Sequence, residues 1–349
     1  MKYHFLKILL AALFIFTGCN TQSDPDEVTL AGVYVLNEGN IGQANASITS
    51  YNPETGEVFQ NVYESVNGVP IGDALQSATL IDGRLYLVVN NSHKIEVVEP
   101  ETFLNIGTIN IADEASPRYI AKAGENKAYV TNLYANTVSI INLESMEETG
   151  SIDVGANPEG IAVVGTKAFV ANSGFGSGNT VSVINTETDT VKETISVGDN
   201  PVGVQADASG RVWVVCVGAY DDFNTESEDE STPGELFVLN GETGTEIEQI
   251  RVGGHPGELV LDSEFGKGYL SNGTVFQINT TTYEIENENF IRGFYALGLS
   301  TLDGEIFLWG ADAGNFSQDG TAFQFDLSGA KIDSFSTGVI PGHFYFDFQ

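Results

Sequence analysis

The chain of 349 residues carries 48 acidic and 14 basic side chains, which gives a formal net charge of −34 at pH 7. A field of this sign repels phosphate backbones, so it argues against nucleic acid as a partner, and it keeps a protein soluble and apart from anionic lipid. A chain of this length can bury a large core of its own without the help of disulfides.

The N-terminal residues have the pattern of an export signal. A basic start precedes an apolar run from Ile8 to Phe16, which is too short to span a bilayer, and two small residues follow directly before Cys19. The segment resembles a bacterial lipoprotein signal, although Phe16 stands where such signals usually have Leu. The resemblance implies a signal peptide over residues 1–18 and acyl chains on Cys19, with an ordinary secretory peptide as the alternative.

Residues 19–29 form a polar, acidic segment that includes Asp24, Asp26 and Glu27. We expect this segment to be a lipidated tether. It resembles the acidic stretch that follows the lipidated cysteine in Bacteroidota lipoproteins exported to the cell surface. The resemblance implies an outer-membrane protein that is attached through its lipid anchor alone and is exposed at the surface.

The second cysteine, Cys216, ends the apolar run 212–216. Because Cys19 is assigned to the anchor, no disulfide within one mature chain is expected. A cysteine on an apolar strand is usually a buried core residue, and a catalytic thiol is the alternative.

Internal repeats fill the chain after the tether. One strand recurs in seven units, at Val33–Asn37, Leu85–Val88, Ala128–Asn132, Ala168–Asn172, Val212–Val215, Gly268–Asn272 and Ile306–Trp309. Each unit contains further short strands, for example Pro158–Val164 before the recurring strand and Thr180–Asn185 after it. Four strands in about 40 to 50 residues are typical of a propeller blade. We therefore predict an all-β, seven-bladed β-propeller of four-stranded blades over residues 30–349.

The two ends of the propeller are predicted to meet in one blade. The first unit, which starts near Val33, has no innermost strand of its own, while the chain finishes with a spare strand over His343–Phe348. We expect this C-terminal strand to complete the first blade, which removes the open sheet edges that promote aggregation.

The loop lengths distinguish the two faces of the predicted propeller. The turns between the first and second strands of the blades are short, as in Asp82-Gly83 and Asp303-Gly304. Long, variable loops connect second strands to third strands or one blade to the next, and rigid scaffolds place binding function on such loops. We call the two sides the short-turn face and the loop face. The variable loops are Glu38–Ala46, Gly68–Ala74, Ser173–Asn179, Gly218–Gly234 and Ala311–Gly320.

The loop face is rich in aromatic, amide and basic side chains, which suit a broad, mostly neutral ligand held by stacking and hydrogen bonds. We expect the Gly218–Gly234 loop to cap this ligand. The alternative is that several of these side chains pack loops against blades and that the arginines pair with carboxylates. The candidate ligand-binding residues are Arg118, Tyr119, Tyr134, Phe175, Asn179, Tyr220, Phe223, Asn224, Arg292, Phe294, Tyr295, Asn315, Phe316 and His343.

Signals of catalysis are sparse. His93, His255 and His343 lie far apart in the sequence without metal-ligand spacing, and the acid-rich stretch 221–230 lacks the ordered spacing of a calcium loop. Neither a nucleophile elbow nor a phosphate-binding glycine loop is present. We therefore expect a binding protein rather than an enzyme, without a cofactor or a metal.

The repeats resemble a known family of propeller units. Ala128-Tyr129-Val130-Thr131-Asn132, followed by Thr137–Asn142 and then by Gly155–Ala162, is similar to the YVTN (YncE-like) β-propeller repeat, and the next unit matches equally well. The likeness extends over essentially every blade. It implies architecture only, because propellers of this kind bind very different ligands.

A narrower resemblance combines the lipoprotein signal, the acidic tether and the seven-bladed YVTN propeller. This combination is similar to the BtuG-type surface lipoproteins of Bacteroidota. The resemblance implies capture of cobalamin or another corrinoid, as a transported ligand, and transfer to a TonB-dependent outer-membrane transporter. The alternatives are a propeller that binds a protein or glycan, or a propeller lactonase, for which Glu159, Glu258 and His343 are the candidate acids and base.

Overall fold

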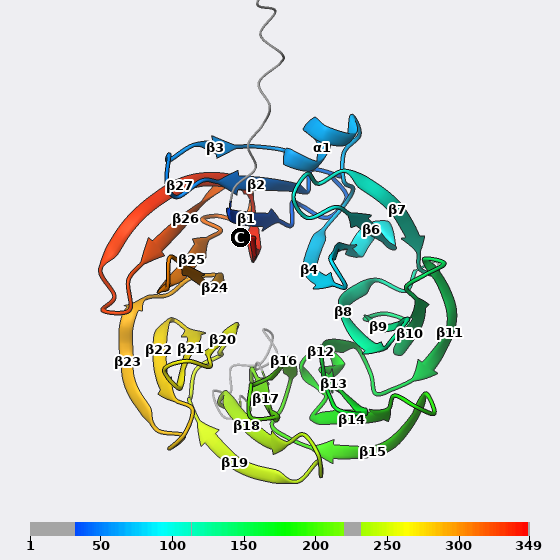
Figure 1. Cartoon of the computed structure of the whole chain (residues 1–349). Helices are drawn as coiled ribbons and strands as arrows, with labels where there is room; N and C mark the ends of the chain where they lie inside the picture. Colours follow the sequence, from blue (N-terminus) through cyan, green and yellow to red (C-terminus); the bar gives the residue numbers. More distant parts are fainter. Residues whose placement is uncertain (1–31, 113, 220–231, 348–349) are drawn as a thin grey trace, which may run out of the picture.

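The computed structural model describes residues 32–112, 114–219 and 232–347. They form seven antiparallel sheets of four strands each, arranged in a ring around a central channel (Figure 1). The predicted all-β, seven-bladed propeller is therefore confirmed. Within the described residues, no helix is long and apolar enough to cross a membrane.

Each blade has one strand at the channel and three strands outside it. The innermost strands are β28 (Pro341–Asp347), β4 (Leu75–Ile81), β8 (Pro117–Gly124), β12 (Pro158–Val164), β16 (Pro201–Ala206), β20 (Leu259–Asp262) and β24 (Ala296–Leu302). The second strands are β1 (Gly32–Asn37), β5 (Arg84–Val89), β9 (Lys127–Asn132), β13 (Lys167–Asn172), β17 (Arg211–Cys216), β21 (Lys267–Asn272) and β25 (Glu305–Asp312). The third strands are β2 (Ser47–Tyr51), β6 (Lys94–Val98), β10 (Thr137–Asn142), β14 (Thr180–Asn185), β18 (Glu235–Asn240), β22 (Thr274–Asn279) and β26 (Asp319–Phe325). The outermost strands are β3 (Val58–Phe59), β7 (Asn105–Asn110), β11 (Glu147–Asp153), β15 (Thr190–Ser196), β19 (Glu246–Arg251), β23 (Ile285–Arg292) and β27 (Lys331–Val339).

The core lies between neighbouring blades. The second strands are buried on both of their faces, so that both Tyr34 and Val35 of β1 are inaccessible to solvent. A strand covered on both sides is a continuous apolar run rather than an alternating one. This burial explains why the recurring strand was the clearest repeat in the sequence.

The C-terminal strand closes the ring. β28 pairs with β1 in antiparallel register, with Phe344 opposite Val35, and the two strands lie side by side in Figure 1 although they come from opposite ends of the chain. Phe344 and Phe346 pack near the Trp309 ring, with centroid distances of 6.3 and 6.0 Å. The predicted seam in the first blade is therefore confirmed.

One blade departs from the repeat in a way that the sequence did not indicate. The outermost strand of the first blade, β3, has only two residues, and the short helix α1 (Val62–Asn67) follows it. Val62 and Tyr63 of α1 are buried in the core cluster around Phe103. Two single-turn 3-10 helices, η1 (Asn90–Ser92) and η2 (Gly174–Gly176), lie in loops between second and third strands.

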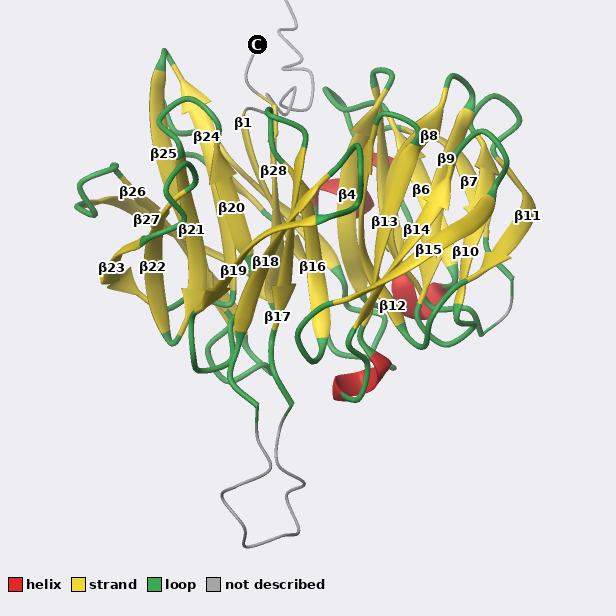
Figure 2. Ribbon diagram, turned by 90° about the horizontal axis from the view of Figure 1, so that it is seen from below, coloured by secondary structure: helices red, strands yellow, loops and turns green. Residues whose placement is uncertain are grey.

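The two faces differ as their loop lengths predicted. The 3-10 helices η1 and η2 and the long connections between second and third strands lie on one side of the disc, and the C-terminal end of β28 lies on the other (Figure 2). Asp82 and Asp303, in the two-residue turns of the short-turn face, have φ of 50° and 52°, each followed by a glycine with positive φ. Aspartate and glycine tolerate this conformation better than other residues.

Candidate functional site

The innermost strands carry a repeated irregularity at their loop-face ends. The pairing with the second strand shifts register between Leu75 and Ser77, between Pro117 and Ile120, between Pro158 and Ile161, and between Pro201 and Gly203. Such β-bulges leave a residue out of the ladder and turn its side chain in a new direction. The residues that follow Leu75 and the three prolines are Gln76, Arg118, Glu159 and Val202.

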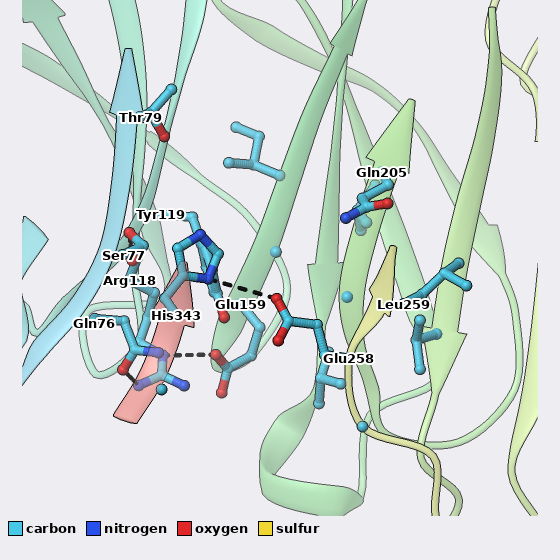
Figure 3. A pocket seen from close by; sticks show the side chains of 18 of the residues that line it. Gln76, Ser77, Thr79, Arg118, Tyr119, Glu159, Gln205, Glu258, Leu259 and His343 are labelled. Atoms are coloured by element: carbon cyan, nitrogen blue, oxygen red, sulfur yellow. Dashed lines mark hydrogen bonds and ion pairs between the residues drawn. The ribbon is translucent and has the colours of Figure 1, made fainter. Parts of the chain in front are cut away.

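These bulges surround a cavity of about 410 Å³ in the central channel. Polar side chains from all seven blades line it, including Gln205 of the fifth blade. Six of them, one from each of the other blades, form a group in which the five that Figure 3 labels point toward one another. We call this set the channel ring. Its members are Gln76, Arg118, Glu159, Glu258, Tyr295 and His343.

Arg118 is held by two neighbours of the channel ring. Its Nε donates to Glu159 Oε2 at 2.7 Å, and its Nη1 donates to Gln76 Oε1 (Figure 3). Only 22% of the Arg118 side chain and 12% of the Glu159 side chain are exposed. Burial raises the pKa of Glu159 above its ordinary value, although the Arg118 charge opposes this shift. Burial alone would lower the pKa of Arg118, but Glu159, Tyr119 and Glu38 together outweigh it and the pKa is raised.

Glu258 and His343 form the second pair of the channel ring. His343 Nδ1 lies 3.5 Å from Glu258 Oε1, and Glu258 Oε2 accepts a hydrogen bond from the backbone N–H of Leu297 at 2.9 Å. The carboxylate is thus fixed from the neighbouring blade. Its contact with the imidazole is an ion pair only when His343 is protonated.

Glu38 adds a third carboxylate beside the ring. It accepts a hydrogen bond from Tyr295 Oη at 3.1 Å, and it occupies the space that a side chain on Gly342 would fill. Burial raises the pKa of Glu38, while Tyr295, Arg118 and His343 oppose that shift. Burial likewise raises the pKa of Tyr295.

One side of the cavity is apolar. Val202, Val204 and Ile161 line the wall next to the polar groups. Tyr119 also lines the cavity, and burial raises its pKa to about 12, so that its hydroxyl stays protonated at neutral pH. The arrangement can hold a polar group by charged and neutral hydrogen bonds while an adjacent apolar part of the ligand contacts the valines.

Two exposed aromatic pairs are found in loops of the loop face. Tyr134 and Phe175 are 59% and 64% exposed, with ring centroids 5.8 Å apart. Tyr295 and Phe316 meet edge to face at 5.3 Å. Exposed aromatic pairs of this kind offer apolar surface to a ligand. We call these four residues the rim aromatics.

The structure brings together some of the residues predicted to bind a ligand. Arg118, Tyr119, Tyr295 and His343 line the channel cavity. The remaining described candidates do not line this cavity.

Three of the candidate residues make contacts within the propeller itself. Phe294 is buried in a core cluster, and the Arg292 guanidinium lies 4.4 Å from the Phe294 ring centroid and 2.8 Å from Asp312. Asn315 Oδ1 accepts from the backbone N–H groups of Ser317 and Gln318, which stabilises its own loop.

Asn179 is exposed at the end of its loop. Tyr220, Phe223 and Asn224 lie outside the described residues, as does most of the loop expected to cap the ligand. The roles predicted for these four residues remain predictions.

Two residues of the site were missed from the sequence. Gln76 has no preceding proline, so its equivalence to Arg118 and Glu159 was not apparent. Glu38 belongs to a variable loop and is brought to the channel by closure of the first blade. Alignment of the seven units on the end of the second strand would have revealed Gln76, because Leu75 pairs with Val89 as Pro117 pairs with Asn132.

Cys216 was the alternative candidate for a catalytic thiol. Cys216 is fully buried in the core cluster of blades four and five, and burial raises the pKa of its thiol to about 12, which does not suit a nucleophile. Within residues 32–112, 114–219 and 232–347, no group of three or more His, Cys, Asp or Glu side chains is placed to hold a metal ion.

Solved structures with the same fold have varied functions. The chain is similar to a provisionally assigned 6-phosphogluconolactonase of Bacteroides uniformis, at 12% identity, with a TM-score of 0.67 and coverage of 91% of this chain and 100% of that chain. A quinonprotein alcohol dehydrogenase-like protein of Bacteroides thetaiotaomicron aligns with a TM-score of 0.65 at 13% identity, covering 91% of this chain and 78% of its own. A functionally unknown protein of Desulfotomaculum acetoxidans aligns with a TM-score of 0.65 at 13% identity, covering 90% and 98%. At such identities the likeness establishes the fold alone.

Among curated proteins, no sequence match is found. One family model does match, over residues 31–219, from the start of the first blade to the end of the second strand of the fifth. This stretch is more than half of the chain and contributes Glu38, Gln76, Arg118 and Glu159 to the site. The chain therefore belongs to the DUF5074 family, which is described as a domain of unknown function.

Proposed function

We propose that this propeller is a capture protein that binds a corrinoid such as cobalamin across the loop-face mouth of its central channel. The observation that carries the proposal is the combination of the channel ring, whose charged members are largely shielded from solvent and fixed by their neighbours, with exposed aromatic pairs on the same face. Preformed polar groups beside apolar surface are characteristic of a ligand site. Exposed aromatic surface adds contact area at a small cost in side-chain entropy.

The size of the cavity supports binding across the mouth rather than inside it. A corrin macrocycle with its side chains is much larger than a cavity of about 410 Å³. The macrocycle therefore lies over the rim aromatics, and one projecting group enters the channel. The amides at the edge of a corrinoid can both donate and accept, which suits a ring that contains Arg118 as a donor and Glu159 as an acceptor.

The place where the chain enters the fold bears on which face would point away from the membrane. β1 begins at Gly32 on the short-turn face and ends at Asn37 on the loop face. A lipid anchor on Cys19 would thus be tied to the face opposite the site. In this arrangement the loop face is open to ligand arriving from outside and to a TonB-dependent transporter that receives it.

The first test is a titration of cyanocobalamin into the full chain, purified in detergent, followed by calorimetry and by the visible spectrum of the corrinoid. We expect saturable, submicromolar binding. The Tyr134→Ala/Phe175→Ala variant should bind at least tenfold more weakly, which is about 1.4 kcal/mol. Phe265→Ala is the matched control, because Phe265 is an exposed aromatic residue in a turn of the short-turn face.

Three outcomes of this titration would contradict part of the proposal. Absence of both heat and spectral change would refute capture of a corrinoid. Binding that the rim variant leaves unchanged would remove Tyr134 and Phe175 from the site, and equal weakening in the Phe265 control would assign the loss to a general effect on the fold.

A second candidate function is hydrolysis of a lactone. It is favoured by one observation, the Glu258–His343 pair in the channel, and by the lactonase assignment of the Bacteroides uniformis protein. In this scheme His343 takes a proton from water, the water oxygen adds to the lactone carbonyl, the ring C–O bond breaks, and the proton passes to the leaving alkoxide. A hydroxy acid results.

Base consumption in a pH-stat with glucono-δ-lactone tests this candidate. Hydrolysis above the spontaneous rate that is lost in His343→Asn and Glu258→Gln, but kept in Phe265→Ala, would favour the enzyme. Spontaneous rates alone would exclude this lactone as a substrate and leave the capture proposal in place.

A further inference from the structure

Negative charge exceeds positive charge at the mouth of the channel. Glu38, Glu159 and Glu258 meet within one site, whereas Arg118 is the one arginine or lysine that lines the cavity among the described residues. His343 adds a positive charge only when it is protonated. A second anion would therefore enter a site that already holds an excess of carboxylates, in surroundings that screen charge poorly.

The ring also keeps hydrogen-bonding capacity that its own contacts do not use. Arg118 has five N–H groups, of which one on Nε and one on Nη1 have partners among the described residues, so three stay available. Glu159 uses Oε2, and its Oε1 has no partner in the described part of the chain. The same holds for Glu38, which accepts from Tyr295 through Oε1 and leaves Oε2 available.

The unused donors of Arg118 and the unused oxygen of Glu159 thus belong to side chains that line one small cavity, with Glu38 beside it. An ammonium group would satisfy the carboxylates but meet the guanidinium of Arg118, and a carboxylate or phosphate would do the reverse. A primary amide satisfies both kinds of group, because its carbonyl accepts from Arg118 and its NH₂ donates to Glu159. It brings no charge of its own, so it adds no repulsion to the site.

Resting on the proposed capture function, we infer that the channel ring is a subsite for one neutral primary amide of the ligand, and that it rejects a carboxylate or phosphate at the same position. The protein thereby selects ligands in which this one projecting group is an amide rather than a carboxylate or phosphate. Tyr134, Phe175 and Phe316, in contrast, contact the apolar faces of the ligand and are indifferent to the state of that group.

The test compares cyanocobalamin with its separated monocarboxylic acid isomers, in each of which one peripheral amide has been hydrolysed to a carboxylate. Dissociation constants are measured by calorimetry at pH 7.5 with the full chain in detergent. We expect at least one isomer to bind tenfold or more weakly than cyanocobalamin. That ratio should shrink at least threefold in Glu258→Gln and in Glu159→Gln, because each variant removes one negative charge and keeps the side-chain shape.

Glu144→Gln is the control for net charge, because Glu144 is exposed in the turn between β10 and β11, on the short-turn face. It should leave the ratio unchanged. Equal affinity for cyanocobalamin and for every isomer, or tighter binding of an acid, would overturn the amide subsite while the capture function stands. A ratio that Glu144→Gln reduces as much as the channel variants do would also overturn it, by assigning the discrimination to the overall field. Failure of cyanocobalamin itself to bind would overturn both proposals together.

Discussion

The buried ion pair between Arg118 and Glu159 predicts a specific, pH-dependent loss of stability when the arginine alone is removed. In Arg118→Met the apolar stem is largely kept, but Glu159 loses its partner while only 12% of its side chain is exposed. Removal of one partner of a buried pair costs about 3 to 5 kcal/mol. We expect about 3 kcal/mol, the lower end of this range, because the pair borders an open channel.

The sign of the pH dependence follows from the pKa of Glu159. Burial already raises this pKa in the folded protein, and Arg118 opposes the shift, so the variant has a still higher folded pKa. Below the unfolded pKa, near 4.3, both states are protonated and the contribution of Glu159 to stability is fully present. As the pH rises toward the folded pKa, the unfolded state loses its proton first, and stability falls by about 1.4 kcal/mol per pH unit. The variant should therefore approach the wild type near pH 4.5 and be least stable at pH 8.

Urea unfolding followed by the fluorescence of the buried Trp213 and Trp309 measures this difference at several pH values. The double variant Arg118→Met/Glu159→Gln carries no buried charge at this site, so it should recover to within about 1 kcal/mol of the wild type at pH 8. Equal stability of Arg118→Met and the wild type at pH 8 would contradict a desolvated pair. A loss that is the same at pH 4.5 and pH 8 would show that the arginine acts through packing instead.

Two further predictions concern the scaffold. The Cys216 thiol should not react with a thiol reagent at pH 8 in the folded protein and should react fully in urea, because burial raises its pKa to about 12; rapid reaction in the native state would contradict its burial. Phe344→Ala should lower the free energy of unfolding by about 3 to 5 kcal/mol, because Phe344 is buried at the seam of the first blade, whereas Phe265→Ala should change it by less than about 0.5 kcal/mol; similar values for the two in urea unfolding would place the seam outside the cooperative core.

The fold could be predicted because its signals are periodic and local. Second strands such as Ala128–Asn132 are buried throughout and mostly apolar, since they are covered on both faces, and this pattern recurs once in every blade. The pairing of the C-terminal strand could be predicted by counting strands. The first unit lacks an innermost strand, and the spare strand at the C-terminus supplies it, because a closed ring of blades leaves no strand unpaired. Helix α1 could not be predicted in the same way, because its six residues gain their stability from burying Val62 and Tyr63 rather than from a helical pattern.

The site could be predicted only in part, because its geometry depends on contacts between blades. Arg118 and His343 were among the residues predicted to bind a ligand on the loop face, and they do reach the channel. Phe294 belongs to the same face in sequence, yet it packs inward against Phe323 and Phe325, since a strand end can direct its side chain to the core as easily as to the loops. Sequence alone indicates which face carries a residue, but not which way the side chain turns.

The innermost strands show how a repeat can keep its scaffold while its ligand chemistry changes. Glu159-Gly160 in the fourth blade and Gly257-Glu258 in the sixth each pair one large polar residue with one glycine, in opposite order. A side chain on Gly160 would collide with the backbone of β16, so glycine there lets neighbouring innermost strands approach closely. The bulge of β12 therefore presents Glu159 to the channel while Gly160 keeps the close contact between strands, and Glu258 enters the channel just before β20 begins. Substitution at these few positions would change what the channel accepts while the apolar second strands continue to specify the same seven blades.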